Sequence, residues 1–151
     1  MFILLRQLAA IRRKADLTRG QPRWLAIRHV DAGSCNGCEH ELGAISNPFH
    51  DLQRHGLDIV ASPRHADLLL VTGTVTSRMR EPLLIAYNAL PEPRRVAALG
   101  DCALGCGILG TSESVLGPVE DFLPVDVRIP GCPPPPDAIA EALLTLLDGR
   151  E

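Results

Sequence analysis

The chain has 151 residues, a length typical of one domain, and carries 15 Lys and Arg against 18 Asp and Glu, a net charge of −3. This balance provides no basic surface for a polyanion, so nucleic acid is not an expected partner. Hydrophobic residues make up 46% of the chain and aromatic residues 3%, which excludes a disordered chain and predicts an aliphatic core.

Residues 1–21 are expected to form an N-terminal segment separate from the domain that follows. Arginines interrupt its apolar residues long before the roughly 20 positions that a membrane-spanning helix needs, so no transmembrane segment is predicted. The helical spacing of the apolar residues instead predicts a short amphipathic helix over residues 3–15. Such a helix suits docking on a partner, lying on a membrane surface or packing on its own domain, and the sequence leaves these open.

Five short apolar runs predict β-strands, and each run ends in a loop rich in Gly, Pro, Ser or Cys. They cover residues 25–30, 57–61, 68–72, 96–99 and 125–129. Helices are expected between them and at the end of the chain, over residues 41–54, 81–90, 112–116 and 137–147. Strands that alternate with helices predict a single α/β domain with a mostly parallel sheet flanked by helices.

Cysteines follow three of the predicted strands. Cys35, Cys102 and Cys132 each lie in the loop after a strand, and Cys38 shares the loop of Cys35. Ligands of open parallel sheets bind outside the carboxyl ends of the strands, so these four thiols are expected to meet. With no predicted signal peptide, the five cysteines of the chain are expected to be free thiols that suit metal binding or redox chemistry.

Three kinds of site fit the four cysteines. Four thiolates hold either Zn²⁺ or an iron–sulfur cluster. Structural zinc sites usually take their ligands from two close pairs, whereas Cys102 and Cys132 are solitary, which favours a bulkier cluster. A thioredoxin-like redox pair at Cys35 and Cys38 also fits the position after a strand, but it gives the other two cysteines no role.

Cys106 is the fifth cysteine and lies four residues after Cys102. It is an alternative to Cys102 as a ligand. Because Cys102 is closer to the end of the strand, we expect Cys102 to be the ligand and Cys106 to be a small thiol beside the site.

Five ordered motifs give the chain a resemblance to the small subunit of membrane-bound (group 4) [NiFe] hydrogenases of the formate hydrogenlyase type. That family is similar to the 20-kDa subunit of respiratory complex I. The resemblance covers roughly residues 22–148 and is carried by Cys35-Asn-Gly-Cys38-Glu-His-Glu41, Ser62-Pro-Arg-His-Ala-Asp67, Thr72-Gly-Thr-Val-Thr76, Gly100-Asp-Cys102-Ala and Pro130-Gly-Cys132-Pro-Pro.

The resemblance implies a flavodoxin-like fold in which residues 22–151 form an iron–sulfur α/β domain. It implies one [4Fe–4S] cluster, the proximal cluster of the complex, bound by Cys35, Cys38, Cys102 and Cys132. The chain would then be an electron-transfer subunit of an oxidoreductase, with the NiFe site in a partner large subunit. Ferredoxin-like iron–sulfur subunits and integral membrane subunits are the other implied partners, at the cytoplasmic face of the inner membrane.

The first two ligands distinguish the two branches of this superfamily. Complex I subunits carry adjacent cysteines, whereas Asn36 and Gly37 separate Cys35 from Cys38 here, as in the hydrogenase branch. We therefore prefer the hydrogenase interpretation, and the 20-kDa cluster subunit of a complex I-type NADH:quinone oxidoreductase is the alternative. The paired glycine usual after the third ligand is replaced here by Cys106-Gly107.

Polar residues near the cysteines have further candidate roles. Glu41, which matches an acidic position of the resembling families, is a candidate proton relay, a charge that tunes the cluster, or a carboxylate favoured by a helix dipole. The hydroxyls of residues 72–76 are candidates for hydrogen bonds to cluster sulfurs or for turn caps. Residues 64–67 match a family motif, and we expect them to form a salt bridge within a loop.

Overall fold

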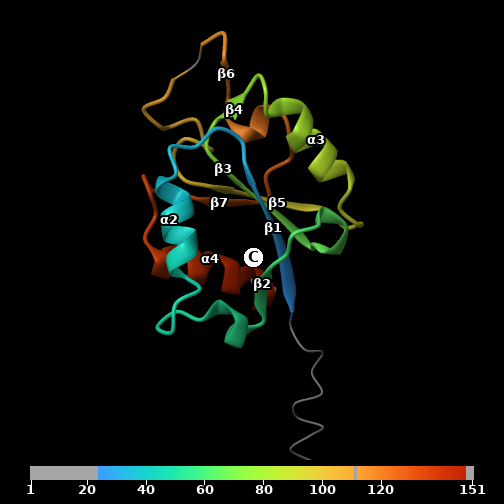
Figure 1. The fold of residues 1–151 in the computed structure, drawn as a ribbon, viewed down its shortest axis with the longest axis vertical. Helices are drawn as coiled ribbons and strands as arrows, with labels where there is room; N and C mark the ends of the chain where they lie inside the picture. Colours follow the sequence, from blue (N-terminus) through green and yellow to red (C-terminus); the bar gives the residue numbers. More distant parts are fainter. Residues whose placement is uncertain (1–23, 111, 149–151) are drawn as a thin grey trace, which may run out of the picture.

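The computed structural model describes residues 24–110 and 112–148 (Figure 1). The predicted N-terminal segment, with its amphipathic helix, lies outside these residues. Within the part of the chain that the structure describes, none of the helices is long and apolar enough to cross a membrane.

A five-stranded sheet forms the centre of the domain. Its strands lie in the order β2-β1-β3-β5-β7 and all neighbours are parallel. Counted among themselves, these strands have the 2-1-3-4-5 order of flavodoxin-like folds, which confirms the predicted fold class. The strands are β1 (Leu25–Asp31), β2 (Leu57–Ile59), β3 (Leu68–Thr72), β5 (Arg95–Leu99) and β7 (Val127–Ile129).

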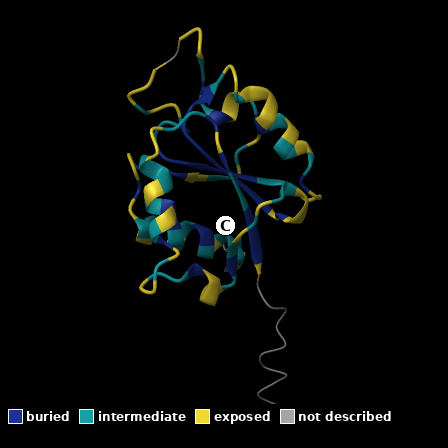
Figure 2. Cartoon of the chain, viewed as in Figure 1, coloured by how far each residue is buried: buried dark blue, intermediate teal, exposed yellow. Residues whose placement is uncertain are grey.

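Helices cover both faces of the sheet (Figure 1). α2 (Gly37–Ala44) and α4 (Pro136–Asp148) pack on one face, and α3 (Arg80–Asn88) packs on the other. Side chains of a strand alternate between faces, so Leu68 and Leu70 of β3 join the first core while Leu69 joins the second. All five residues of β3 are buried, which explains its continuous apolar sequence, and Figure 2 shows the buried sheet inside a partly exposed shell.

The predicted helix over residues 41–54 is wrong at both ends. α2 begins earlier, at Gly37, and ends at Ala44, while a short 3₁₀ helix covers Leu52–His55. Pro48 disfavours helical geometry at the residue before it. That residue, Asn47, instead forms a turn in which its side-chain oxygen accepts hydrogen bonds from the backbone N–H groups of the two residues after Pro48, at 2.8 and 3.1 Å.

The short helix predicted near residues 112–116 is also wrong. β6 (Val115–Gly117) lies there and pairs antiparallel with β4 (Val75–Thr76), forming a small second sheet. The Thr74 hydroxyl reinforces this pairing because it donates a hydrogen bond to the Gly117 carbonyl at 2.8 Å. Strands this short leave almost no periodic pattern, so no signal in the sequence indicates them.

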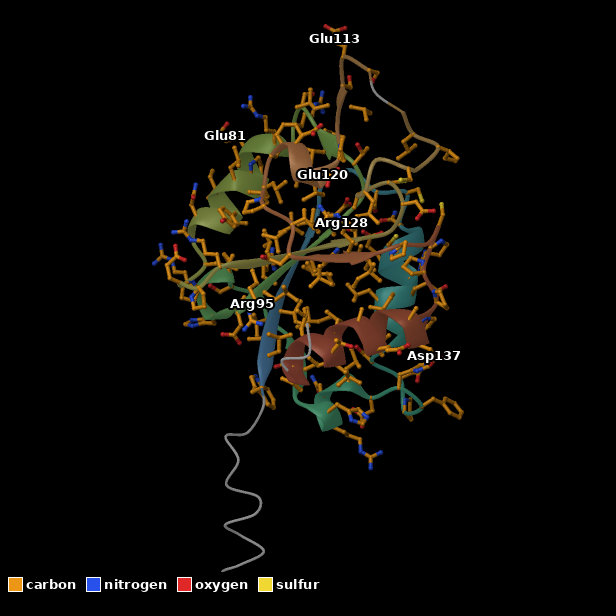
Figure 3. All side chains as sticks on the ribbon, turned by 180° about the vertical axis from the view of Figure 1, so that it is seen from behind. Glu81, Arg95, Glu113, Glu120, Arg128 and Asp137 are labelled. Atoms are coloured by element: carbon orange, nitrogen blue, oxygen red, sulfur yellow. The ribbon has the colours of Figure 1, made fainter. Side chains whose placement is uncertain are left out.

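The edge strand β7 carries a charged pair on its exposed side. Arg128 Nη2 lies 2.8 Å from Glu120 Oε2, which belongs to a 3₁₀ helix over Val119–Asp121, and both residues are labelled in Figure 3. Charged side chains on an edge strand disfavour pairing with another chain.

Candidate metal centre

The four predicted ligands line one cavity at the carboxyl end of the sheet. Cys35 and Cys38 come from the turn between β1 and α2, Cys102 follows β5, and Cys132 follows β7. The cavity has a volume of about 100 Å³, and its remaining lining residues are Ser34, Gly37, Gly73, Asp101, Gly131 and Pro133. The predicted convergence of loops that are distant in sequence is therefore confirmed.

A short turn sets the position of the first cysteine. The Asp31 carboxylate accepts hydrogen bonds from the backbone N–H groups of Gly33 and Ser34, at 2.8 and 2.7 Å. This turn at the end of β1 is of the kind that aspartate side chains favour. Asn36 then takes a left-handed conformation with φ 69° and α2 begins, which directs Cys35 and Cys38 to the same cavity.

Two glycines leave the space that the sulfurs occupy. A Cβ atom on Gly100, which has φ +90°, would lie 2.5 Å from Cys38 Sγ. A Cβ atom on Gly107 would lie 2.5 Å from Cys102 Sγ. A side chain at either position would collide with a sulfur, so the backbone forms a cradle around the thiols that only glycine permits.

The thiols influence one another, as expected for groups that share a small space. Burial, Glu39 and the other three cysteines of the site raise the pKa of Cys38 to about 11, with burial as the largest cause. Burial first, followed by Cys132 and Cys35, also raises the pKa of Cys102. A cationic metal centre shared by the thiolates offsets part of this mutual repulsion.

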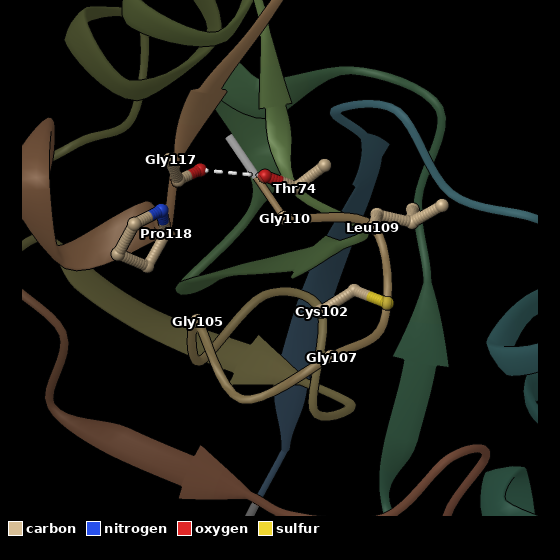
Figure 4. Close-up of a pocket in the computed structure, with 8 residues that line it drawn as sticks. All are labelled: Thr74, Cys102, Gly105, Gly107, Leu109, Gly110, Gly117 and Pro118. Carbon is tan, nitrogen blue, oxygen red and sulfur yellow. Dashed lines mark hydrogen bonds between the residues drawn. The ribbon is translucent and has the colours of Figure 1, made fainter. Parts of the chain in front are cut away.

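Cys106 does not line the cavity. Its side chain is exposed, and its Sγ lies 3.8 Å from the Leu104 carbonyl oxygen. A second cavity, of about 190 Å³, adjoins Cys102 on the side of Gly107 and Leu109 (Figure 4). Of these two cysteines, Cys102 is the one that lines the cavity together with Cys35, Cys38 and Cys132.

The four thiols surround a space instead of converging on one point. Among residues 24–110 and 112–148, no three His, Cys, Asp or Glu side chains are close enough to hold a single metal ion. Four sulfur donors around a glycine-lined cavity fit the chemistry of an iron–sulfur cluster, which takes thiolate ligands on separate corners.

A hydrogen-bond network behind Cys38 was not anticipated from the sequence. The Glu39 carboxylate accepts hydrogen bonds from the Thr72 hydroxyl and, at 2.7 Å, from the Ser34 hydroxyl. His29 Nε2 lies 2.9 Å from Thr72 Oγ1 and 3.6 Å from Glu39 Oε1. The network ties the first turn of α2 to β1 and β3. The one available signal was an acidic residue directly after a predicted ligand.

The other predicted polar residues have the following positions. Glu41 is half-buried on α2. The hydroxyl of Thr76 donates to the Ala32 carbonyl at 3.0 Å, so together with Thr72 and Thr74 it bonds within the protein. Instead of the expected loop salt bridge, the Asp67 carboxylate accepts a hydrogen bond from the backbone N–H of Ala26 at 2.9 Å.

Comparison with known proteins gives several relatives. A probable membrane-bound hydrogenase subunit of Pyrococcus furiosus is 42% identical over 129 residues, 85% of this chain and 76% of the relative. Formate hydrogenlyase subunit 7 of Escherichia coli is 45% identical over 125 residues, and the match covers 83% of this chain but only 49% of that subunit. An NADH-quinone oxidoreductase subunit of Citrifermentans bemidjiense is 44% identical over 111 residues, 74% of this chain and 65% of the relative.

A solved structure and a family model extend these similarities. A chain of the membrane-bound sulfane sulfur reductase, an archaeal respiratory membrane complex, matches with a TM-score of 0.71 and 31% identity, over 87% of this chain and 74% of that chain. The family model described as NADH ubiquinone oxidoreductase, 20 Kd subunit matches residues 35–146, which include all four cavity cysteines. The chain therefore belongs to the family of the NADH ubiquinone oxidoreductase 20 Kd subunit, a family of oxidoreductase-complex subunits.

Proposed function

We propose that the chain binds one [4Fe–4S] cluster through Cys35, Cys38, Cys102 and Cys132 and transfers electrons within a membrane-associated [NiFe] hydrogenase complex. The observation that carries this proposal is the meeting of four thiols from three strand ends around one cavity. When bound, the cluster supplies one-electron transfer. The chain itself breaks no substrate bond in this proposal.

The shape of the site favours a cluster over zinc. Zn–S bonds of about 2.3 Å draw four sulfurs onto a single ion, which leaves no cavity between them. Here the cavity of about 100 Å³ separates loops that follow three different strands. Gly100 and Gly107 leave room for the sulfur atoms of Cys38 and Cys102 at the edge of the cavity. The ligand loops can therefore surround a group that is larger than a single ion.

Residues of the chain have separate tasks in the proposed function. The four thiolates bind the cluster, and the Asp31 turn orients the first of them. The Glu39 carboxylate lies beside Cys38 and bonds to Thr72 and Ser34, so it fixes a negative charge near the cluster. Negative charge nearby disfavours the reduced state, in keeping with the low potential that hydrogen chemistry requires.

The spacing of the first two cysteines favours the hydrogenase branch. Identity alone does not separate the branches, because the formate hydrogenlyase subunit is 45% identical and the NADH-quinone oxidoreductase subunit 44% identical. Cys35 and Cys38 are separated by two residues, as the resemblance implies for hydrogenases. The alternative is a 20-kDa cluster subunit of a complex I-type NADH:quinone oxidoreductase, in which the same thiols bind the same cluster.

The proposed partners follow from the relatives. Their names include a membrane-bound hydrogenase and an archaeal respiratory membrane complex. We propose that the chain contacts a large subunit with the NiFe site and ferredoxin-like iron–sulfur subunits, and that integral membrane subunits anchor the complex. The chain then lies peripherally at the cytoplasmic face of the membrane.

Glu41 is proposed to relay protons between the chain and its large subunit. It is half-buried and lies one helical turn from Cys38, on the helix whose first turn provides that ligand. This position gives it a place near the cluster and access to the surface. The network around Glu39 involves a different carboxylate, so the two glutamates are separable by mutation.

A set of serine variants tests the proposed ligands. Serine replaces a soft thiolate by a hard hydroxyl, which is a poor ligand for iron in a cluster. We expect Cys35→Ser, Cys38→Ser, Cys102→Ser and Cys132→Ser each to lose or convert the cluster, measured by iron, sulfide and electron paramagnetic resonance. Cys106→Ser is the matched control and is expected to keep it. A full cluster in Cys102→Ser would contradict the ligand set.

A second assay distinguishes the two branches. The complex purified through a tag on this chain is expected to reduce a viologen dye with H₂. Reduction of a quinone by NADH, without activity toward H₂, would instead support the complex I-type alternative.

A further inference from the structure

Two aspartates join neighbouring parallel strands by the same pair of hydrogen bonds, one between backbone groups and one from a backbone N–H to the aspartate carboxylate. The Asp67 N–H donates to the Ala26 carbonyl at 2.7 Å, and the Ala26 N–H donates back to the Asp67 carboxylate at 2.9 Å. Asp126 and Val96 repeat the arrangement at 2.9 and 2.7 Å. Both aspartates directly precede a strand, so these clamps secure the amino ends of β3 and β7, far from the cysteines.

Asp101 forms a third clamp, but at the opposite end of the sheet. Its backbone N–H donates to the Gly131 carbonyl at 2.8 Å, and the Gly131 N–H donates to Asp101 Oδ1 at 2.7 Å. Asp101 precedes Cys102 and Gly131 precedes Cys132, so the clamp joins two ligand loops directly. Asp101 also lines the cavity with the four cysteines.

The backbone on both sides of this clamp is restrained. Gly131 has φ +139°, and a Cβ atom there would lie 2.6 Å from Pro134 Cα. The Asp101 carbonyl accepts a hydrogen bond from the Cys106 N–H at 2.8 Å, which closes the turn that contains Cys102. Removal of the Asp101 carboxylate would therefore remove one of the two hydrogen bonds that set the distance between the two ligand loops.

The carboxylate also lies within electrostatic reach of the ligands. Asp101 directly precedes Cys102 in the chain, and it lines the same cavity as the four thiols. A negative charge on the wall of this cavity opposes the addition of an electron to a cluster held by the same loop.

We propose that Asp101 is a positioning residue that sets the spacing of the Cys102 and Cys132 loops, and that its charge lowers the reduction potential of the cluster between them. The proposal rests on the proposed function, since it requires the cluster. It assigns Asp101 two separable properties, a hydrogen-bond acceptor and a charge.

Three variants of the full chain, purified anaerobically, separate these properties. Asp101→Ala removes the acceptor and the charge, and Asp101→Asn keeps an acceptor oxygen but removes the charge. Asp126→Ala is the matched control, because it removes the same kind of bond from the other end of the same β5–β7 pair. Iron and sulfide per chain, the reduction potential of the cluster and a thermal melt are measured for each.

We expect Asp101→Ala to lose most of its iron, Asp126→Ala to keep it, and Asp101→Asn to keep it with a potential shifted to more positive values. Equal iron in Asp101→Ala and wild type, or equal losses in Asp101→Ala and Asp126→Ala, would overturn the positioning role. If Asp101→Ala does not fold, Asp101→Asn decides, and an unchanged potential in it would overturn the proposal. A wild-type chain without iron and sulfide would instead overturn the proposed function.

Discussion

Gly100→Ala perturbs the candidate centre at the point of closest contact between backbone and sulfur. The added Cβ would lie 2.5 Å from Cys38 Sγ. Non-bonded contacts between heavy atoms are optimal at about 3.5–4.0 Å, so the sulfur must withdraw by about 1–1.5 Å. Metal sites hold their ligand distances to within about 0.2 Å, so a displacement of this size removes Cys38 as a ligand.

The same substitution strains the backbone, and a control separates that effect. Gly100 has φ +90°, and left-handed geometry costs a non-glycine residue about 1–2 kcal/mol. Gly110 has φ +57° with nothing within 4 Å of an added Cβ, so Gly110→Ala carries the backbone cost alone. Overpacking adds about 1–3 kcal/mol to the loss of stability in Gly100→Ala.

Iron and sulfide analysis together with the visible spectrum measures the outcome. We expect Gly100→Ala to lose the intact cluster and Gly110→Ala to retain it. A Gly100→Ala protein with the wild-type iron content and spectrum would refute the assignment of Cys38 Sγ to the site.

Two further predictions concern proton transfer and pH. Glu41→Gln is expected to lower turnover of H₂ by about 10²–10⁴-fold if this residue is the only proton route, with the cluster spectrum unchanged. Glu81→Gln, at an exposed residue of α3 (Figure 3), is the control. Normal turnover in Glu41→Gln would contradict the relay. Burial lowers the pKa of His29 below its ordinary value of 6.5, so the folded state favours the neutral imidazole. The stability that this preference contributes is fully present above about pH 6.5 and is lost as the pH falls through the lowered pKa. When the pH is lowered from about 7.5 to about 5, the urea concentration at the unfolding midpoint should therefore fall less in His29→Gln than in wild type. His65→Gln, at an exposed histidine, is the control and should follow wild type. Identical pH profiles for all three proteins would contradict the reasoning.

Features that depend on local sequence were predictable. The apolar run at residues 68–72 coincides with β3, and the loops after β1, β5 and β7 bring the cysteines together because parallel strands share one carboxyl edge. The helix at residues 81–90 was found at Arg80–Asn88, since its proline, Pro82, lies in the first turn, where proline is tolerated. The helix over residues 41–54 failed because the turn at Asn47 and Pro48 outweighs the helical pattern around it.

Features that depend on strand register were not predictable. The Glu39 network requires β3 to place Thr72 opposite the end of β1, where Asp31 is its partner in the register. The Asp101 clamp requires β5 and β7 to be neighbours, although their loops are far apart in sequence. The sequence indicated Glu41 as the carboxylate with a candidate role. The hydrogen bonds of Glu39 and Asp101, which only the structure shows, identify two further carboxylates beside the cysteines.

Metal and sulfide analysis of the anaerobically purified full chain tests the central claim most directly. The account predicts about four iron atoms and about four sulfides per chain, with a visible absorbance that bleaches under reductant and a paramagnetic signal in the reduced protein. A colourless protein that contains zinc bound to the same four cysteines, without iron or sulfide, would contradict it.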